Sequence, residues 1–401
     1  MRFAFILLFL TAAAPAQSVP QLQTSHTTEN LRGVSAVSRS IAWASGAHGT
    51  YLRTTDGGRT WIAAQVPGAG SLDFRGVVAF SASEAFLLSA GPGDQSRIYH
   101  SADSGRHWQL QFTNSNPKGF FDSMVFWDRT HGIVLGDPIP DESGKDTGKE
   151  SGKDTGKLRF ELLITTNGQT WTPIPPAQLP PAADGEGAFA ASNSCLAILP
   201  TAAVTSASAP RNSSEKEAAS PPDPNIWFAT GGKLARVFHS PDLGKTWQVF
   251  DTPILHGPDS AGIFSIAFRD PAHGVIAGGD YKHADRDGPD LAFTNDGGKT
   301  WTLSQIFPQA YFSAVAYDRG ARYNDRKSKD PKAKKRDFDE NETGDRLFIV
   351  APKFIFDFRP PQDPTRISPR KRSGAQFNAV SPYPTGGALV VGPKGSIASI
   401  P

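Results

Sequence analysis

A short phrase recurs five times along the chain and limits what the chain can fold into. It reads TTDGGRTW ending at Trp61, SADSGRHW at Trp108, TTNGQTW at Trp171, SPDLGKTW at Trp247 and TNDGGKTW at Trp301. Repetition at this level is typical of architectures that stack one supersecondary unit many times. Five copies exclude chance. The phrase therefore predicts a repeat array.

The phrase has the chemistry of a tight turn between two strands. We expect the carboxylate of its acid to accept a backbone N–H two residues on, and the glycine that follows to adopt a positive φ. The tryptophan then begins the next strand and packs between neighbouring sheets. The third copy has Asn167 instead of an acid and is one residue shorter, so its turn is expected to be the least regular. The acids of the other copies are Asp56, Asp103, Asp242 and Asp296.

Short runs of β-branched and aromatic residues precede each phrase and predict the remaining strands. Examples are RGVSAVS with IAWAS, and RGVVAF with AFLLSA. Each repeat is thus a four-stranded antiparallel sheet, which must stack on its neighbours to bury its apolar faces. The chain is predicted to be all-β, a seven-bladed β-propeller in a single domain over residues 17–401.

The last two blades lack a clean phrase. AYFSAVAY, RLFIVAP and FIFDFRPPQDPTRIS predict a sixth blade with an eroded turn, while QFNAVSP, GGALVVG and GSIASI supply only three strands of a seventh. The segment VPQLQTSH near the N-terminus is the natural donor of the fourth strand. Pairing of the two termini would close the ring and cover its exposed edges. A six-bladed ring with an extra cap is the alternative.

The turn phrase resembles the Asp box (BNR repeat) of sialidase-type propellers. The fuller pattern, with HGIVLGDP, FAASNSCLAI, AGIFSIAF and HGVIAGGDY between the phrases, resembles the bacterial relatives of the photosystem II stability and assembly factor family. That resemblance covers most of the chain after the N-terminal segment. It implies a binding or assembly function, with an exported or membrane protein as the partner.

The N-terminus predicts export. Arg2 precedes the apolar run FAFILLFLTAAA, and Ala14-Pro15-Ala16 supplies the small residues that precede a cleavage site. Residues 1–16 are interpreted as a signal peptide, which places the mature chain in the periplasm or outside the cell. The alternative is an uncleaved anchor. The single cysteine, Cys195, leaves the chain without an intrachain disulfide, so its stability must come from packing and closure.

Composition excludes some partners. The formal charge of +2 gives no general attraction to nucleic acid or to an anionic membrane, and no later segment is apolar enough to span a bilayer. We expect a monomer. Three polar stretches are interpreted as solvated loop insertions, with a partner-docking arm as the alternative reading. They lie at about 141–157, 201–224 and 319–345.

Blade topology brings the starts of the innermost strands and the ends of the second strands to one face, opposite the Asp-box turns. Pairing Phe126 with Ile133 would place Asp122 directly across from Asp137. Blade 5 repeats the idea after two glycines that would have to form a bulge, and Glu186 is expected to open the first strand of blade 4. The candidate ligand-binding residues of this face are Asp122, Asp137, Glu186, Asp280, Tyr281 and Lys282.

These residues favour a non-catalytic platform that recognises a protein or a carbohydrate polymer. The sequence contains no Gly-rich phosphate loop, Cys/His metal cluster or G-x-S-x-G nucleophile motif. No cofactor, metal site or catalytic residue is predicted. The alternative is a glycoside hydrolase, which would need two carboxyl groups about 5 to 9.5 Å apart around a sugar. Only the pair Asp122 and Asp137, or Glu186, is available for that role.

Overall fold

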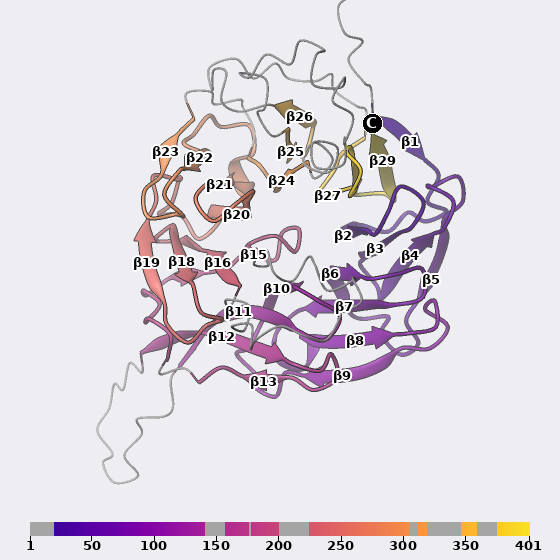
Figure 1. Cartoon of the computed structure of the whole chain (residues 1–401), viewed down its shortest axis with the longest axis horizontal. Coiled ribbons are helices and arrows are strands. Elements are labelled where there is room, and N and C mark those ends of the chain that lie inside the picture. Colours follow the sequence, from indigo (N-terminus) through magenta and orange to yellow (C-terminus); the bar gives the residue numbers. More distant parts are fainter. Residues whose placement is uncertain are drawn as a thin grey trace, which may run out of the picture.

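The chain folds as a closed ring of antiparallel sheets around a central channel in the computed structural model (Figure 1). The structure describes residues 20–140, 157–175, 178–199, 224–304, 311–318, 346–358 and 375–401. Seven sheets follow one another around the ring. The prediction of a seven-bladed β-propeller is confirmed.

Six blades are built in chain order from the innermost strand outwards. Blade 1 contains β2 (Leu31–Ala36), β3 (Ala42–Gly46), β4 (Thr50–Thr54) and β5 (Ile62–Gln65); blade 2 contains β6 (Asp73–Ala79), β7 (Ala85–Ala90), β8 (Arg97–Ser101) and β9 (Gln109–Thr113); blade 3 contains β10 (Phe121–Phe126), β11 (Gly132–Pro140), β12 (Leu158–Thr165) and β13 (Thr172–Pro173). Blade 4 contains β15 (Leu196–Leu199), β16 (Asn225–Ala229), β18 (Arg236–Ser240) and β19 (Gln248–Asp251); blade 5 contains β20 (Ala261–Phe268), β21 (Gly274–Asp280), β22 (Leu291–Thr294) and β23 (Thr302–Leu303); blade 6 contains β24 (Ala314–Tyr317), β25 (Leu347–Ala351) and β26 (Phe354–Phe358).

Blade 7 joins the two ends of the chain. Its inner strands are β27 (Ala379–Pro382), β28 (Ala388–Gly392) and β29 (Ser396–Ile400), and its outermost strand is β1 (Gln21–Gln23). Gln21 pairs with Ser399, and Gln23 with Ile397. Figure 1 shows β1 beside β29 at the edge of the ring. The predicted closure by the N-terminal segment is confirmed.

Some predictions fall outside the described residues. The predicted signal peptide lies there entirely, and so do nearly all residues of the three polar insertions and the eroded turn of blade 6. These interpretations stay predictions. Among the described residues, no helix is both long and apolar enough to cross a bilayer.

Seven hydrophobic clusters of the described residues lie between adjacent blades. The Asp-box tryptophans take part in five of them: Trp61 packs between blades 7 and 1, Trp108 between blades 1 and 2, and Trp171 between blades 2 and 3. Trp247 and Trp301 pack in the same way at the next two interfaces. The predicted role of these tryptophans is confirmed. Because each indole packs between its own blade and the preceding one, the repeat phrase helps to fix how the blades stack.

The Asp-box turns differ in one detail from the prediction. The Asp56 carboxylate accepts the N–H of Thr60, four residues on, at 2.9 Å, and the Thr60 hydroxyl at 2.5 Å. Asp103, Asp242 and Asp296 also accept the N–H four residues on, so the predicted spacing of two is wrong. A positive φ at each residue after the acid, such as Gly57, opens the turn enough for the longer reach. The hydrogen bonds from Thr60 lower the pKa of Asp56 to about 2.

The third turn has a tighter geometry. Asn167 accepts the N–H groups of Gln169 and Thr170, two and three residues on, because one residue is missing. This copy departs from the other four, as its sequence predicts.

Candidate functional site: the mouth of the channel

A cavity of about 460 Å³ lies at the mouth of the central channel, on the face where the innermost strands begin. Residues from all seven blades, or from the segments that lead into them, line it. The larger side chains are Arg32, Arg75, Phe120, Asp122, Asp137, Phe189, Phe264, Tyr281, Tyr311 and Asn378. Its volume is within the range of small-ligand sites.

A β-bulge repeated in four blades directs one side chain of each innermost strand into this cavity. The register shifts by one residue in β2, β6, β10 and β20, and in each case the unpaired residue lines the cavity. A bulge re-aims a side chain that regular alternation would place elsewhere. The four residues are Arg32, Arg75, Asp122 and Phe264.

Glycine follows both bulged arginines because there is no room for a side chain. A β-carbon on Gly33 would lie 2.7 Å from the Ser45 hydroxyl oxygen and 3.0 Å from the backbone oxygen of Arg75. One on Gly76 would lie 2.6 Å from the Asn193 side-chain oxygen. The close approach of these other chain segments thus explains the repeated Arg-Gly sequence.

The two arginines share a single carboxylate. Nε of Arg75 donates to Asp73 at 2.9 Å, and Nε of Arg32 lies 3.7 Å from the same Oδ2 atom. Arg75 also donates to the backbone oxygen of Ala190 at 3.3 Å. About a quarter of each guanidinium side chain remains exposed. Two positive charges on one negative charge leave this part of the mouth with an excess positive charge.

Asp122 and Asp137 both line the cavity, but not as a directly opposed pair. Phe126 pairs with Gly132 rather than with Ile133, and the bulge leaves Asp122 without a partner residue on β11. Asp137 lies on a second bulge, between Gly136 and Pro138 in the pairing of β11 with β12. The predicted register is therefore wrong by one residue, although the two side chains still reach the same cavity.

Asp122 is a buried acid without a hydrogen-bond partner. Its side chain is 1% exposed, and neither oxygen is bonded within the described residues. Burial raises its pKa well above the usual value, and repulsion from Asp137 adds to this shift, while the positive charge of Arg75 opposes it. The protonated form of Asp122 is therefore favoured relative to that of an exposed aspartate.

Asp137 is the acid that faces the cavity. Its Oδ1 accepts the N–H of Ala188 at 2.9 Å. Burial raises its pKa to about 6, against the opposing effect of that hydrogen bond. Asp137 therefore titrates just below neutral pH.

Aromatic rings from blades 4 to 6 form another part of the cavity wall, while the charged groups come from blades 1 to 3. The Phe264 ring has centroid distances of 4.6 Å to Phe189, 6.2 Å to Tyr281 and 5.6 Å to Tyr311. Tyr281 is 48% exposed, the most accessible of the four. This wall offers apolar contact area next to the charged groups.

Glu186 does not reach the mouth. The innermost strand of blade 4 begins at Leu196, so the expectation that Glu186 opens it is wrong. Glu186 instead lies in β14 (Glu186–Gly187), which pairs with β17 (Gly231–Gly232). Its buried carboxylate accepts hydrogen bonds from Arg236 and from Thr230, the latter at 2.7 Å. These contacts give it a structural role.

Asp280 and Lys282 also lie outside the cavity lining, whereas Tyr281 between them is part of it. Asp280 is buried and caps the short 3-10 helix η5 (Tyr281–His283), accepting the N–H of Lys282 at 3.0 Å and contacting Nδ1 of His283 at 2.7 Å. The bulge of this hairpin is at Phe264 on β20, not at Gly278 and Gly279 as supposed. Lys282 is exposed.

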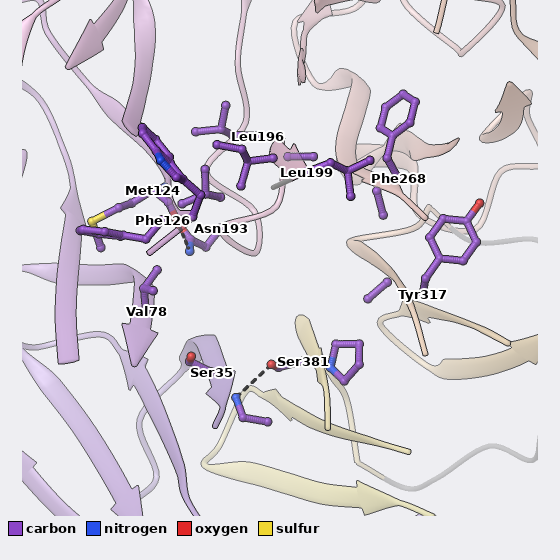
Figure 2. A pocket seen from close by; sticks show the side chains of 18 of the residues that line it. Ser35, Val78, Met124, Phe126, Asn193, Leu196, Leu199, Phe268, Tyr317 and Ser381 are labelled. Atoms are coloured by element: carbon purple, nitrogen blue, oxygen red, sulfur yellow. Dashed lines mark hydrogen bonds between the residues drawn. The ribbon is translucent and has the colours of Figure 1, made fainter. Parts of the chain in front are cut away.

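A second cavity of about 810 Å³ opens at the other end of the channel, where the innermost strands end (Figure 2). Side chains such as Phe126, Leu196 and Phe268 make its lining mainly apolar. Figure 2 shows Ser381, whose hydroxyl accepts the N–H of Ala36 at 3.0 Å across the junction of blades 7 and 1. Strand direction places the Asp-box turns on this same face. Asp122, Asp137, Arg32 and Arg75 line the first cavity, whereas the charged residues that line the second are Arg269 and Asp318.

In the described part of the chain, no three His, Cys, Asp or Glu residues gather as metal ligands.

No protein-family profile and no curated sequence matches this chain. Solved structures do match. This chain is structurally similar to YCF48. The structure described as YCF48 bound to D1 peptide has a TM-score of 0.55 at 12% identity, over 95% of this chain and 96% of that one. YCF48 from Cyanidioschyzon merolae has a TM-score of 0.54 at 14% identity, over 95% and 98%.

WD40 propellers match almost as well as YCF48. The WD40 propeller domain of Doa1 has a TM-score of 0.53 at 10% identity, over 96% of this chain and 97% of that one. Identities this low show a shared fold. Function has to be argued from the site.

Proposed function

We propose that this chain is an exported, non-catalytic binding protein that recognises a polypeptide segment through the mouth of its channel. The observation that carries the proposal is the arginine pair, in which two guanidinium groups from adjacent blades face one cavity and share one carboxylate. An arginine fork is suited to a carboxylate, which it binds through paired charge-assisted hydrogen bonds.

The ligand group is a carboxylate of a polypeptide, either a C-terminus or an acidic side chain. A cavity of about 460 Å³ accommodates one chain end or one or two side chains, while Tyr281 and Phe264 provide apolar contacts for the neighbouring residue. The rest of a longer partner would lie across the face. One structure with the same fold contains a bound peptide, which supports the choice of a polypeptide.

The same geometry favours binding over glycoside hydrolysis. A glycosidase places two carboxyl groups against its substrate. Both side chains line the cavity, but both oxygens of Asp122 are closed to solvent, so only Asp137 of the pair offers an accessible carboxyl oxygen. One accessible acid does not provide that chemistry.

The export part of the proposal rests on the N-terminal sequence, in which Arg2 and an apolar run precede Ala14-Pro15-Ala16. The partner is then an exported or envelope protein. Mass spectrometry of the protein from its native envelope fraction is expected to find Gln17 at the N-terminus. Retention of Met1 would contradict export by cleavage.

Replacing Arg32 and Arg75 together with alanine is expected to weaken binding of a carboxylate probe by about 100-fold, because each charge-assisted hydrogen bond contributes about 1.5 to 3 kcal/mol. The probe is pentaalanine with a free C-terminus and a rhodamine label on its N-terminal amine, followed by fluorescence anisotropy. Its C-terminal amide is the reference ligand and is expected to bind as weakly as the double variant binds the acid.

A matched control removes the same charge from the opposite face. Arg59 and Arg106 are exposed in the Asp-box turns, where each donates to a backbone oxygen of its own turn. The double alanine variant at these positions is expected to bind the probe like the wild type. An equal loss of affinity in both double variants would show only a general charge effect. It would refute the proposed carboxylate site between Arg32 and Arg75, which we call the arginine seat.

A further inference from the structure

Asp137 lines the cavity that also holds Arg32 and Arg75, and burial raises its pKa to about 6. Its Oδ1 is held by the N–H of Ala188, and its Oδ2 has no partner among the described residues. An anion seated on Arg32 and Arg75 would therefore share the cavity with a second anion whenever Asp137 is ionised.

The charged and titratable groups on the surrounding elements do not remove this conflict. Glu161 accepts a hydrogen bond from Asn114 at 2.7 Å, and Glu186 pairs with Arg236. The Cys195 thiol is buried, and burial raises its pKa well above the usual value. Among the described residues, the set is Arg32 on β2, Asp73 and Arg75 on β6, Asp122 on β10, Glu161 on β12, Glu186 on β14, Cys195 before β15, Tyr281 on η5 and Tyr311 before β24.

The net charge of the cavity depends on whether Asp137 is ionised or protonated. Arg32, Arg75 and Asp73 sum to one positive charge, and burial favours the neutral form of Asp122. An ionised Asp137 cancels that remaining charge. A protonated Asp137 restores it.

We propose that the carboxylate seat is proton-gated: the ligand carboxylate enters between Arg32 and Arg75 while Oδ2 of Asp137 takes up one proton from solvent. This inference rests on the proposed function of the mouth and adds its regulation. The hydrogen bond from Ala188 to Oδ1 stays in place, so the proton goes to the free oxygen. The O–H group that forms can then donate to the ligand, replacing repulsion with attraction.

Burial prepares Asp137 for this exchange. Its pKa of about 6 in the empty site means that little free energy is needed to add the proton near neutral pH. A nearby anion raises that pKa further, because a like charge disfavours the ionised form. Linkage then requires the affinity for the anion to increase as pH falls.

The test measures probe binding between pH 5.5 and 8 with the full mature protein. Two probes separate the possible sources of the carboxylate: acetyl-pentaalanine with a free C-terminus, and an amidated pentapeptide with a central glutamate. For the probe that binds, Kd is expected to fall by about tenfold from pH 7.5 to pH 5.5. Calorimetry in buffers of different ionisation heat is expected to show proton uptake at pH 7.

Asp137→Asn supplies the specific control, because its amide oxygen can still accept the N–H of Ala188 while its charge is gone. The variant is expected to bind at pH 8 as tightly as the wild type binds at pH 5.5, with no slope between. Its melting temperature checks that the fold is kept.

The outcomes separate the two proposals. Binding with a flat pH profile, proton release, or an unchanged slope in Asp137→Asn would overturn the proton gate and leave the arginine seat intact. Failure of both probes to bind at every pH would overturn the seat itself, and the gate with it.

Discussion

Asp122→Asn is expected to raise the free energy of unfolding by an amount that grows with pH. In the folded protein Asp122 holds its proton more tightly than in the unfolded chain, because it is buried without a hydrogen-bond partner. Its contribution to stability is thus complete below the ordinary pKa of about 3.9 and is lost as pH rises through the raised native pKa. Asparagine has no proton to lose and avoids this cost.

Chemical denaturation at several pH values measures the effect. The advantage of Asp122→Asn is expected to be near zero at pH 4 and to grow by about 1.4 kcal/mol per pH unit above it, until pH passes the native pKa. Asp251→Asn, an exposed carboxylate on β19, is the control and is expected to show no such trend. A variant less stable than the wild type at pH 7 would mean that Asp122 is ionised and satisfied, contrary to the geometry.

Deleting residues 20–24, which contain β1, is expected to destabilise the ring and cause aggregation. The deletion removes the three pairs with β29 and leaves the edge of blade 7 open to other chains. It also removes Gln23, which accepts the indole N–H of Trp61 at 2.9 Å and donates to the backbone oxygen of Gly57 at 3.2 Å. The loss should exceed about 3 kcal/mol, since several hydrogen bonds and a strand are lost together.

Equilibrium unfolding and light scattering measure the two consequences. Gln23→Ala keeps the strand but loses both side-chain bonds, so it is expected to cost about 1 to 3 kcal/mol without aggregation. A soluble deletion variant with an unchanged unfolding midpoint would show that terminal pairing contributes nothing to closure.

The fold was largely predictable because its determinants are local and repeated. The Asp-box acid, the residue of positive φ and the tryptophan lie within eight positions, and their recurrence indicates both the turn and the packing between blades. The missing strand of blade 7 followed from counting, since QFNAVSP, GGALVVG and GSIASI supply three strands where the other complete blades have four.

The site was predictable only in part because bulges break the two-residue alternation of a strand. Reading blade 3 as a regular hairpin paired Phe126 with Ile133 and hid the bulge at Asp122. The same assumption of regular alternation in blades 1 and 2 left Arg32 and Arg75 unnoticed. Aligning the innermost strands would have revealed them, since an apolar residue, a cavity-lining residue and a small residue recur in Leu31-Arg32-Gly33, Phe74-Arg75-Gly76, Phe121-Asp122-Ser123, Ile263-Phe264-Ser265 and Phe377-Asn378-Ala379.

Glu186 was misplaced for a different reason. The sequence GEGAF looks like the start of a strand, but the innermost strand of blade 4 begins ten residues later, at Leu196. The buried contact of Glu186 with Arg236 joins residues 50 positions apart. No local pattern indicates such a pairing.

We propose the mouth of the channel, where the innermost strands begin, as the binding site. A crystal structure of the mature protein with acetyl-pentaalanine at pH 5.5 tests this proposal. We expect the terminal carboxylate between the guanidinium groups of Arg32 and Arg75, with the peptide passing Tyr281. A peptide seated in the apolar cavity at the other end of the channel, or on the Asp-box turns beside Arg59, would contradict it.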